Sequence, residues 1–262
     1  MLDKTLADKV ISISHQAGEK IMEIYQRDFG IYEKSDQSPL TEADLAAHHC
    51  IVDGLKALSD LPILSEESAN IPWAERNQWQ QYWLVDPLDG TKEFIKKNGE
   101  FTVNIALIDQ GKPVFGVVYA PVLQQTYVGM AGHGARKLSN GEWTNISPKA
   151  HQTGDVWRVV GSRSHQSPEI QAFLDSLGGE SELVAMGSSL KLCLVAEGAA
   201  HLYPRLGPTS EWDTAAAQAV VEAAGGKVTV IDDPAKARQQ DVKALRYNQQ
   251  ESVLNPYFLV SY

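Results

Sequence analysis

The hydrophobic periodicity of this chain changes twice along its length, and that change most limits the folds it can adopt. Residues 5–25 repeat apolar side chains at helical spacing, and a second helical pattern begins after Thr41, which can cap it. Short apolar runs typical of strands follow at residues 61–65, 82–86, 101–108, 114–119 and 125–129. We therefore expect two helices followed by an antiparallel sheet in the first half of the chain.

A turn-rich stretch at residues 132–154 contains no long apolar run and separates two patterns. Beyond it strand and helix signals alternate, with strands expected at 157–161, 183–186 and 201–204 and helices at 168–177, 188–196 and 214–224. The sequence thus predicts a mixed α/β protein in two halves, residues 1–150 and residues 151–262. It has neither a Walker loop nor a glycine-rich dinucleotide motif.

The composition is that of an ordinary globular protein, with 262 residues, of which 43% are hydrophobic and 21% charged. The chain lacks an apolar run long enough to cross a membrane, and residues 1–4 do not begin a secretory signal. Two cysteines form no disulfide framework, so we expect a reduced, cytoplasmic setting. The net charge of −10 argues against binding a nucleic-acid polymer, and a phosphate substrate would require bound cations.

Residues 83–91, Trp-Leu-Val-Asp-Pro-Leu-Asp-Gly-Thr, are the most informative stretch. An apolar strand delivers Asp86 at its end, and a turn can direct Asp86, Asp89 and the Leu88 carbonyl toward one centre. Gly90 permits a tight backbone, and Thr91 adds a hydroxyl at the start of an expected helix. Mg²⁺ prefers such hard oxygen ligands. The alternative is an ordinary Asp-Pro turn.

Two other acidic segments could complete such a site. Glu66 and Glu67 follow the strand expected at 61–65, although a solvated acidic turn, taken alone, is the better explanation of them. Asp213 opens an Ala-rich helical segment that ends at Gly225. The alternative is that Asp213 is simply the N-cap of that helix. A helix N-terminus is also a favourable place to bind phosphate.

Residues 83–94 resemble the first signature of the inositol monophosphatase family of metal-dependent phosphatases. Residues 212–226, W-D-T-A-A-A-Q-A-V-V-E-A-A-G-G, resemble its second, and Glu66 falls where the family has a Glu-Glu ligand motif. The similarity runs through nearly the whole chain, from residues 41–44 to Gly226. It implies the fold of that family, in which helix and sheet layers alternate, with the last metal ligand and the nucleotide-binding elements in residues 151–262.

The resemblance implies two or three magnesium ions in one site. One Mg²⁺ would be bound by Glu66, Asp86 and the Leu88 carbonyl. A second would be shared by Asp86, Asp89 and Asp213. Residues 34–40 would close over a third, weaker metal ion.

The same resemblance implies a catalytic pair. Thr91 and Asp44 match the Thr–Asp pair with which the family orients and deprotonates the attacking water. The alternative for Asp44 is first-turn charge on a helix capped by Thr41.

The nucleotidase branch of the family is the part most similar to this chain, in residues 92–94 (Lys-Glu-Phe), 161–165 (Gly-Ser-Arg-Ser-His) and 187–191 (Gly-Ser-Ser-Leu-Lys). The implied contacts to the adenosine and its 5′-phosphate are Ser162, His165, Gly187 and Lys191. The implied substrate contacts at the metal site are Glu66, Leu88, Gly90, Thr91 and Asp213. Alone, Lys191 could be a solvent-facing helix residue and His165 a turn residue.

The expected activity is Mg²⁺-dependent hydrolysis of the 3′-phosphate of adenosine 3′,5′-bisphosphate (PAP) to AMP and phosphate, extending to its 5′-sulfated relative (PAPS to APS). By resemblance, the enzyme would clear a by-product of sulfate activation and be inhibited by lithium. Two alternatives stay open: an inositol or sugar phosphatase, and a non-catalytic nucleotide-sensing protein. The sequence also leaves open a homodimer and loose attachment to the cytoplasmic face of the inner membrane.

Overall fold

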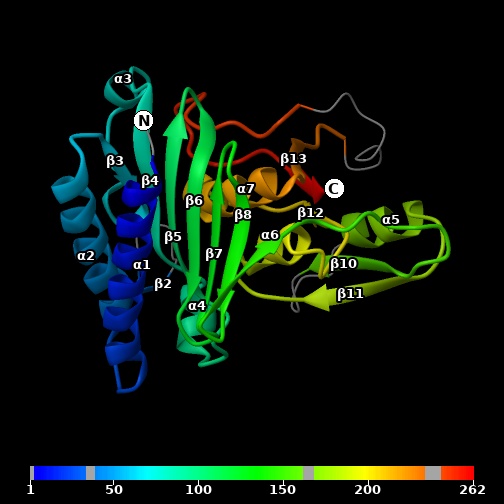
Figure 1. The fold of residues 1–262 in the computed structure, drawn as a ribbon, viewed down its shortest axis with the longest axis horizontal. Coiled ribbons are helices and arrows are strands. Elements are labelled where there is room, and N and C mark those ends of the chain that lie inside the picture. Colours follow the sequence, from blue (N-terminus) through cyan, green and yellow to red (C-terminus); the bar gives the residue numbers. More distant parts are fainter. Residues whose placement is uncertain (1–2, 34–38, 162–167, 234–242) are drawn as a thin grey trace.

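The computed structural model describes residues 3–33, 39–161, 168–233 and 243–262, arranged in alternating layers of helix and sheet (Figure 1). Helices α1 (Lys4–Tyr25) and α2 (Glu42–Leu58) pack side by side on one face of a large sheet. Helices α6 (Leu190–Ala196) and α7 (Glu211–Ala224) cover its other face. The predicted layered α/β fold is confirmed.

Seven strands form the large sheet, in sequence order, and only β3 and β4 pair in parallel. They are β3 (Ile63–Ser65), β4 (Gln81–Asp89), β5 (Thr102–Asp109), β6 (Lys112–Ala120), β7 (Gln125–Met130), β8 (Gly134–Ser139) and β9 (Glu142–Ile146). The expected antiparallel strands at 101–108, 114–119 and 125–129 are confirmed. The sequence pattern missed β8 and β9, because β8 is only half-buried and β9 is mostly exposed, so neither carries an apolar run.

The rest of the C-terminal half forms two small sheets. One contains β12 (Tyr203–Arg205), β14 (Phe258–Ser261) and β13 (Lys227–Val230), and the other pairs β10 (Trp157–Gly161) with β11 (Ser181–Ala185), beside α5 (Pro168–Ser176). The remaining elements are β1 (Ile31–Glu33), β2 (Pro39–Thr41), η1 (Glu66–Ser68), α3 (Trp73–Arg76) and α4 (Thr91–Ile95). Within the described ranges no sheet joins strands from both halves, and the division near residue 150 stays a proposal.

Alternate side chains of the large sheet enter two different cores. Trp83 and Val85 on β4 pack toward α1 and α2, whereas Tyr82 and Leu84 pack toward α6 and α7. All four side chains are buried. Strand β4 is therefore packed on both faces, and this packing fixes the position of the residues at its C-terminal end.

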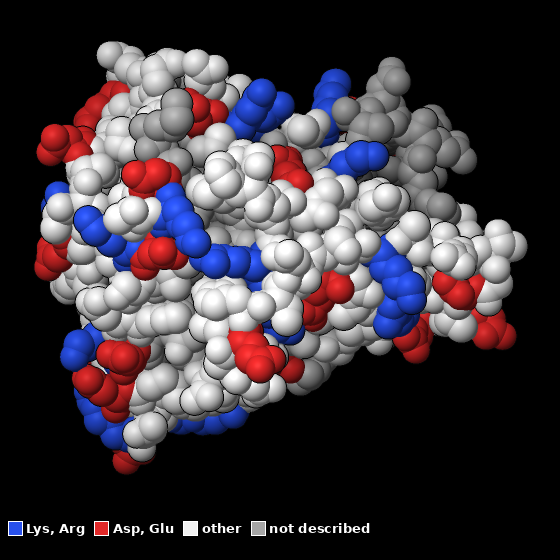
Figure 2. Space-filling view, viewed as in Figure 1, with Lys and Arg blue, Asp and Glu red and all other residues white. Residues whose placement is uncertain are grey.

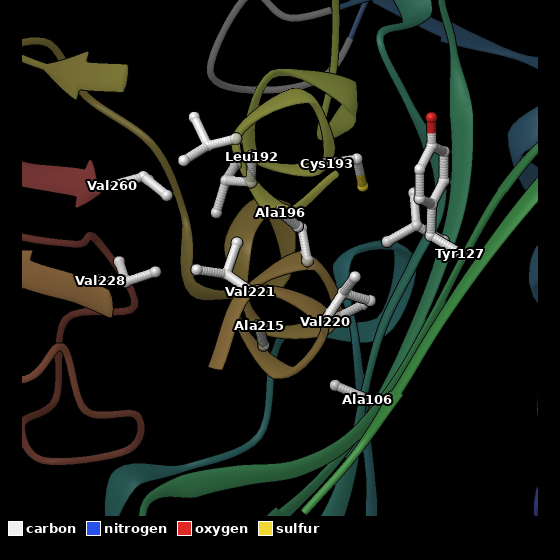
Figure 3. Packing of buried hydrophobic residues seen from close by; sticks show 14 of the residues in the cluster. Ala106, Tyr127, Leu192, Cys193, Ala196, Ala215, Val220, Val221, Val228 and Val260 are labelled. Carbon is white, nitrogen blue, oxygen red and sulfur yellow. The ribbon is translucent and has the colours of Figure 1, made fainter. Parts of the chain in front are cut away.

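Helix α7 packs very close to the sheet because the strands carry small residues where the helix crosses them. Ala106, Gly116 and Gly129 are directly paired across β5, β6 and β7, and Ala216 and Ala219 of α7 approach the two glycines. Figure 3 shows α7 side chains between this sheet and α6. The close approach fixes the height of α7, and with it the N-terminal turn of that helix, above the sheet.

We expect Gly116→Ala to destabilise the protein by about 3 kcal/mol, since a Cβ there would lie 2.1 Å from the Ala216 carbonyl oxygen. For a chain of this size that corresponds to a fall in Tm of about 6–12 °C. Gly207→Ala is the matched control, because its Cβ would meet nothing nearer than the Arg205 Cζ at 4.0 Å. Thermal unfolding measures both variants, and equal Tm values would show that α7 has room to move.

The surface carries mixed charge. On the face shown in Figure 2, acidic and basic side chains are interspersed, without a continuous basic stripe. Among the described helices, none combines the length and the apolar character that a membrane crossing requires.

Candidate active site

The C-terminal end of β4 brings two carboxylates together. The strand continues to Asp89, whereas the sequence indicated an end at Asp86. Pro87 has no N–H, and it falls where the pairing of β4 with β5 is interrupted. The Leu88 amide donates to Asp86 Oδ1 at 3.1 Å. Gly90 then adopts a φ of 93°, which turns the chain into α4.

Asp213 reaches the same place from the start of α7. The helix begins at Glu211, not at Thr214 as the sequence indicated, and Ser210 is its N-cap. Asp213 is therefore not the N-cap; its Oδ2 accepts from the Ser210 amide at 2.9 Å and completes a capping box. One carboxylate oxygen each of Asp86, Asp89 and Asp213 lies within 4.8 Å of the other two. The capping role and a shared acidic centre are thus compatible.

Glu66 adds a fourth carboxyl group. It begins η1 directly after β3, and β3 pairs in parallel with β4, so both strands end at the same edge. Glu66 hydrogen-bonds the Asp86 carboxyl group, and its charge also acts on Asp213. Three separate segments of the chain therefore contribute to one cluster, in which Glu66 contacts Asp86 beside the group formed by Asp86, Asp89 and Asp213.

A Thr–Asp pair borders this cluster. Asp44 Oδ2 accepts from the amide and the hydroxyl of Thr41, at 2.7 and 2.6 Å, as the capping box of α2. Asp44 Oδ1 faces the Thr91 hydroxyl at 3.2 Å, and that hydroxyl also lies 3.4 Å from the Leu88 carbonyl oxygen. Asp44 is 1% exposed. Its two oxygens are divided between the helix cap and the cluster, so the two alternatives raised for Asp44 do not exclude each other.

The crowding of carboxyl groups has a large electrostatic effect. Burial raises the pKa of Asp86 well above its ordinary range, and the charges of Glu66, Asp89 and Asp213 raise it further. Burial and the Asp89 charge raise the pKa of Asp213 to about 8. Ionised carboxylates at this spacing require cations to balance them. Four carboxyl groups and a nearby carbonyl form an all-oxygen donor set, which fits Mg²⁺.

We expect Mg²⁺ to raise the Tm by about 5–10 °C, the shift for a ligand present at about 100 times its Kd. The rise should be larger at pH 8 than at pH 6. A carboxyl group whose folded-state pKa is raised loses its proton on unfolding, so without metal the stability falls as pH rises between 3.8 and about 8. Melting curves in chelator and in saturating Mg²⁺ measure this, and a Tm unaffected by Mg²⁺ at either pH would contradict it.

Two residues that hold Asp89 in place were missed by the sequence reasoning. Asp89 Oδ2 accepts from the Ser189 amide at 2.6 Å and from the Ser189 hydroxyl at 2.5 Å, and it lies 3.4 Å from Asn104 Nδ2. Asn104 Nδ2 also donates to Ser189 Oγ, and Ser189 Oγ lies 2.8 Å from the Asp213 carbonyl oxygen. A buried amide within the apolar run 101–108 was the signal for Asn104. Ser189 gave no separate signal.

The residues predicted to contact the nucleotide are only partly described. Ser162 and His165 lie outside the described residues. The Gly187 amide donates to Glu100 Oε2 at 2.8 Å, and a Cβ there would approach the Glu100 carbonyl oxygen to 2.8 Å, so local packing alone demands this glycine. Lys191 is half-buried, and its Nζ lies 5.9 Å from the centre of the Tyr203 ring.

Comparison with known families gives one match over almost the entire chain. The model of the inositol monophosphatase family matches residues 3–256. The 3′(2′),5′-bisphosphate nucleotidases CysQ of Shigella flexneri and Escherichia coli K12 are 48% and 49% identical to this chain. Each alignment covers 98% of this chain and 99% of the relative.

Solved structures agree with this similarity. CysQ from Bacteroides thetaiotaomicron, described as a bacterial member of the same family, has 42% identity and a TM-score of 0.84, covering 98% of this chain and 97% of its own. The IMPase from Thermotoga maritima has 23% identity and a TM-score of 0.74, covering 97% and 91%. The similarity to the Thermotoga maritima protein supports a shared fold only.

Proposed function

The chain belongs to the inositol monophosphatase family, and from this membership we propose that it is a metal-dependent 3′-phosphatase of PAP, releasing AMP and phosphate. The observation that carries the proposal is the similarity to 3′(2′),5′-bisphosphate nucleotidases along 98% of the chain. Its chemical counterpart is the cluster of Asp86, Asp89 and Asp213, whose oxygens lie within 4.8 Å of one another. PAPS, the sulfated relative of PAP, fits the same proposal.

We propose that the carboxyl cluster holds the metal ions. Glu66, Asp86 and the Leu88 carbonyl would hold one ion, and Asp86, Asp89 and Asp213 a second. Divalent cations supply charge stabilisation to the attacking and leaving oxygens of a phosphate displacement. Ser189 and Asn104, not counted among the ligands, would keep Asp89 in the orientation that this requires.

The Thr91–Asp44 pair provides a route for the proton. A water that attacks phosphorus would pass a proton to Thr91 Oγ1, while the Thr91 hydroxyl proton moves to Asp44 Oδ1 across 3.2 Å. Thr41 holds the other oxygen of Asp44, which fixes the direction of the carboxylate. The water oxygen forms the new P–O bond as the P–O3′ bond breaks, which releases phosphate. The ribose 3′-oxygen takes up a proton from solvent to complete AMP, and Asp44 returns its proton to solvent.

The substrate preference is tested by comparing kcat/KM for PAP and for inositol 1-phosphate with the purified protein and Mg²⁺. We expect PAP to be preferred by at least about 100-fold. Inositol 1-phosphate lacks the second phosphate and the adenosine, and a site with polar groups for these discriminates strongly against a substrate without them. A preference for the inositol ester would make the chain an inositol phosphatase. Absence of Mg²⁺-dependent phosphate release from either compound would make it a non-catalytic binding protein.

Finer properties follow from the same proposal. We propose Mg²⁺ as the ion, with two ions in the cluster and a third, weaker one near residues 34–40, of which 34–38 lie outside the described residues. Lithium should inhibit by displacing a magnesium ion. A cytoplasmic location, with or without attachment to the inner membrane, and a homodimer stay predictions, to be checked by fractionation and by sedimentation.

A further inference from the structure

Glu66 has less backbone support than the other carboxyl groups of the cluster. It follows β3, a strand of three residues at the edge of the large sheet, which pairs with β4 alone among the described strands. It begins η1, which also has only three residues. Asp86 and Asp89 lie on the nine-residue β4, which is paired on both sides, and Asp213 lies within α7. The orientation of Glu66 therefore depends on side-chain contacts made by its own segment.

The residue before Glu66 makes one such contact. Ser65 is at the N-cap position of η1, where a serine hydroxyl ordinarily accepts from a backbone amide of the helix, but its side chain makes no capping bond here. Instead, Ser65 Oγ and His48 Nδ1 share a hydrogen bond of 2.8 Å, and Ser65 is fully buried. Burial lowers the pKa of His48, so its imidazole is mainly neutral at pH 7. The Ser65 hydroxyl is thus bound to α2 and not to its own helical turn.

Helix α2 reaches the candidate site at two points. Asp44 and His48 are four residues apart and therefore lie one turn apart on the same side of the helix. Asp44 faces the Thr91 hydroxyl, and His48 contacts Ser65. The helix packs against α1 and β4, so its position is fixed by the core. One helix thus supports both the Thr–Asp pair and the segment that leads into Glu66.

We propose that His48 is a positioning residue of the metal site, which acts through Ser65 to hold Glu66 in the orientation that binds a metal ion. This inference rests on the proposed function, because it requires the carboxyl cluster to bind divalent cations. A neutral imidazole adds no charge to the cluster, so its contribution is the orientation of a ligand. Hydrogen bonds that orient metal ligands typically change metal affinity by about 10- to 100-fold.

The test measures metal binding without substrate, by electron paramagnetic resonance of Mn²⁺ titrated into the full chain. His48→Ala should weaken one Mn²⁺ site by about 10- to 100-fold and change the other by less than about threefold, since Asp89 and Asp213 do not depend on Ser65. The Mg²⁺ concentration that gives half-maximal turnover should rise by the same factor. Because saturating metal restores the position of Glu66, kcat at saturating Mg²⁺ should fall by less than about threefold.

Matched variants separate this role from a structural one. Ser65→Ala should cause the same loss of Mn²⁺ affinity, and the double variant should be no weaker than either single one, because both residues act through one hydrogen bond. His48→Asn should recover most of the affinity, since its amide group can take the place of the imidazole Nδ1. His49→Ala is the control: His49 is the next residue, it is exposed, and its ring lies 5.4 Å from that of His48.

The outcomes distinguish the inference from the function on which it rests. A merely structural role would lower the Tm in chelator and leave the Mn²⁺ affinity unchanged, so unchanged affinity in His48→Ala or in Ser65→Ala would overturn the inference. If His48→Ala does not fold, Ser65→Ala decides the question. A wild-type protein that binds no Mn²⁺ would instead overturn the proposed function.

Discussion

Asp89→Asn is expected to lower kcat by at least about a thousandfold, the loss of several kcal/mol of transition-state stabilisation, while the protein stays folded. Asp89 is one of the three carboxylates whose oxygens lie within 4.8 Å of one another. Asparagine keeps an acceptor for Ser189 and Asn104, but it removes the charge that a second divalent ion requires. Steady-state kinetics at saturating Mg²⁺ measure the effect.

The stability of this variant distinguishes a ligand from a structural residue. Removing one negative charge relieves repulsion in the cluster, so in chelator the Tm of Asp89→Asn should equal or exceed that of the wild type. Its rise on addition of Mg²⁺ should shrink. Asp109→Asn is the control, because Asp109 pairs with Gln81 at the opposite end of the same two strands. Wild-type turnover in Asp89→Asn would show that Asp89 is not a metal ligand.

Asp44→Asn is expected to lower kcat by about 10²–10³-fold, within the range of general-base catalysis. An asparagine side chain can still accept from Thr41 and cap α2, but it cannot take a proton from Thr91. Thr91→Ala should cause a similar loss, and the double variant should be scarcely slower than either single one, since both residues act in one step.

A second acidic residue in the same helical turn provides the control. Glu42 also lies in the first turn of α2, where its carboxylate pairs with Arg27 at 2.8 Å. Glu42→Gln should leave kcat within about twofold, since an exposed ion pair contributes little. If Asp44→Asn and Glu42→Gln had the same mild effect, Asp44 would serve only the helix.

The helices and the central strands could be predicted because their burial is periodic in sequence. Helix α1 buries one stripe of side chains, and β5 is buried along nearly its whole length. β13 and β14 could not be predicted, since each has four residues and their pairing joins segments about thirty residues apart. The edge strand β9 is mostly exposed and its neighbour β8 is half-buried, so neither carries an apolar run that the sequence could show.

The candidate site was predictable where its residues have few alternatives. Asp86 and Asp89 lie at the end of a buried strand, where an acidic side chain is rare and therefore indicates a functional role. The Ser189 hydroxyl could not be assigned in that way, because serine is common on surfaces. Its role depends on the N-cap of α6 meeting the end of β4, a contact between segments about a hundred residues apart.

A crystal structure of the protein with Mn²⁺ and AMP would test the shared metal centre most directly, because anomalous scattering locates each ion. We predict two ions bridged by Asp86, one also contacting Glu66 and the other contacting Asp89 and Asp213. Ions bound elsewhere, or a single ion that touches neither Glu66 nor Asp213, would contradict a metal centre assembled from these three segments.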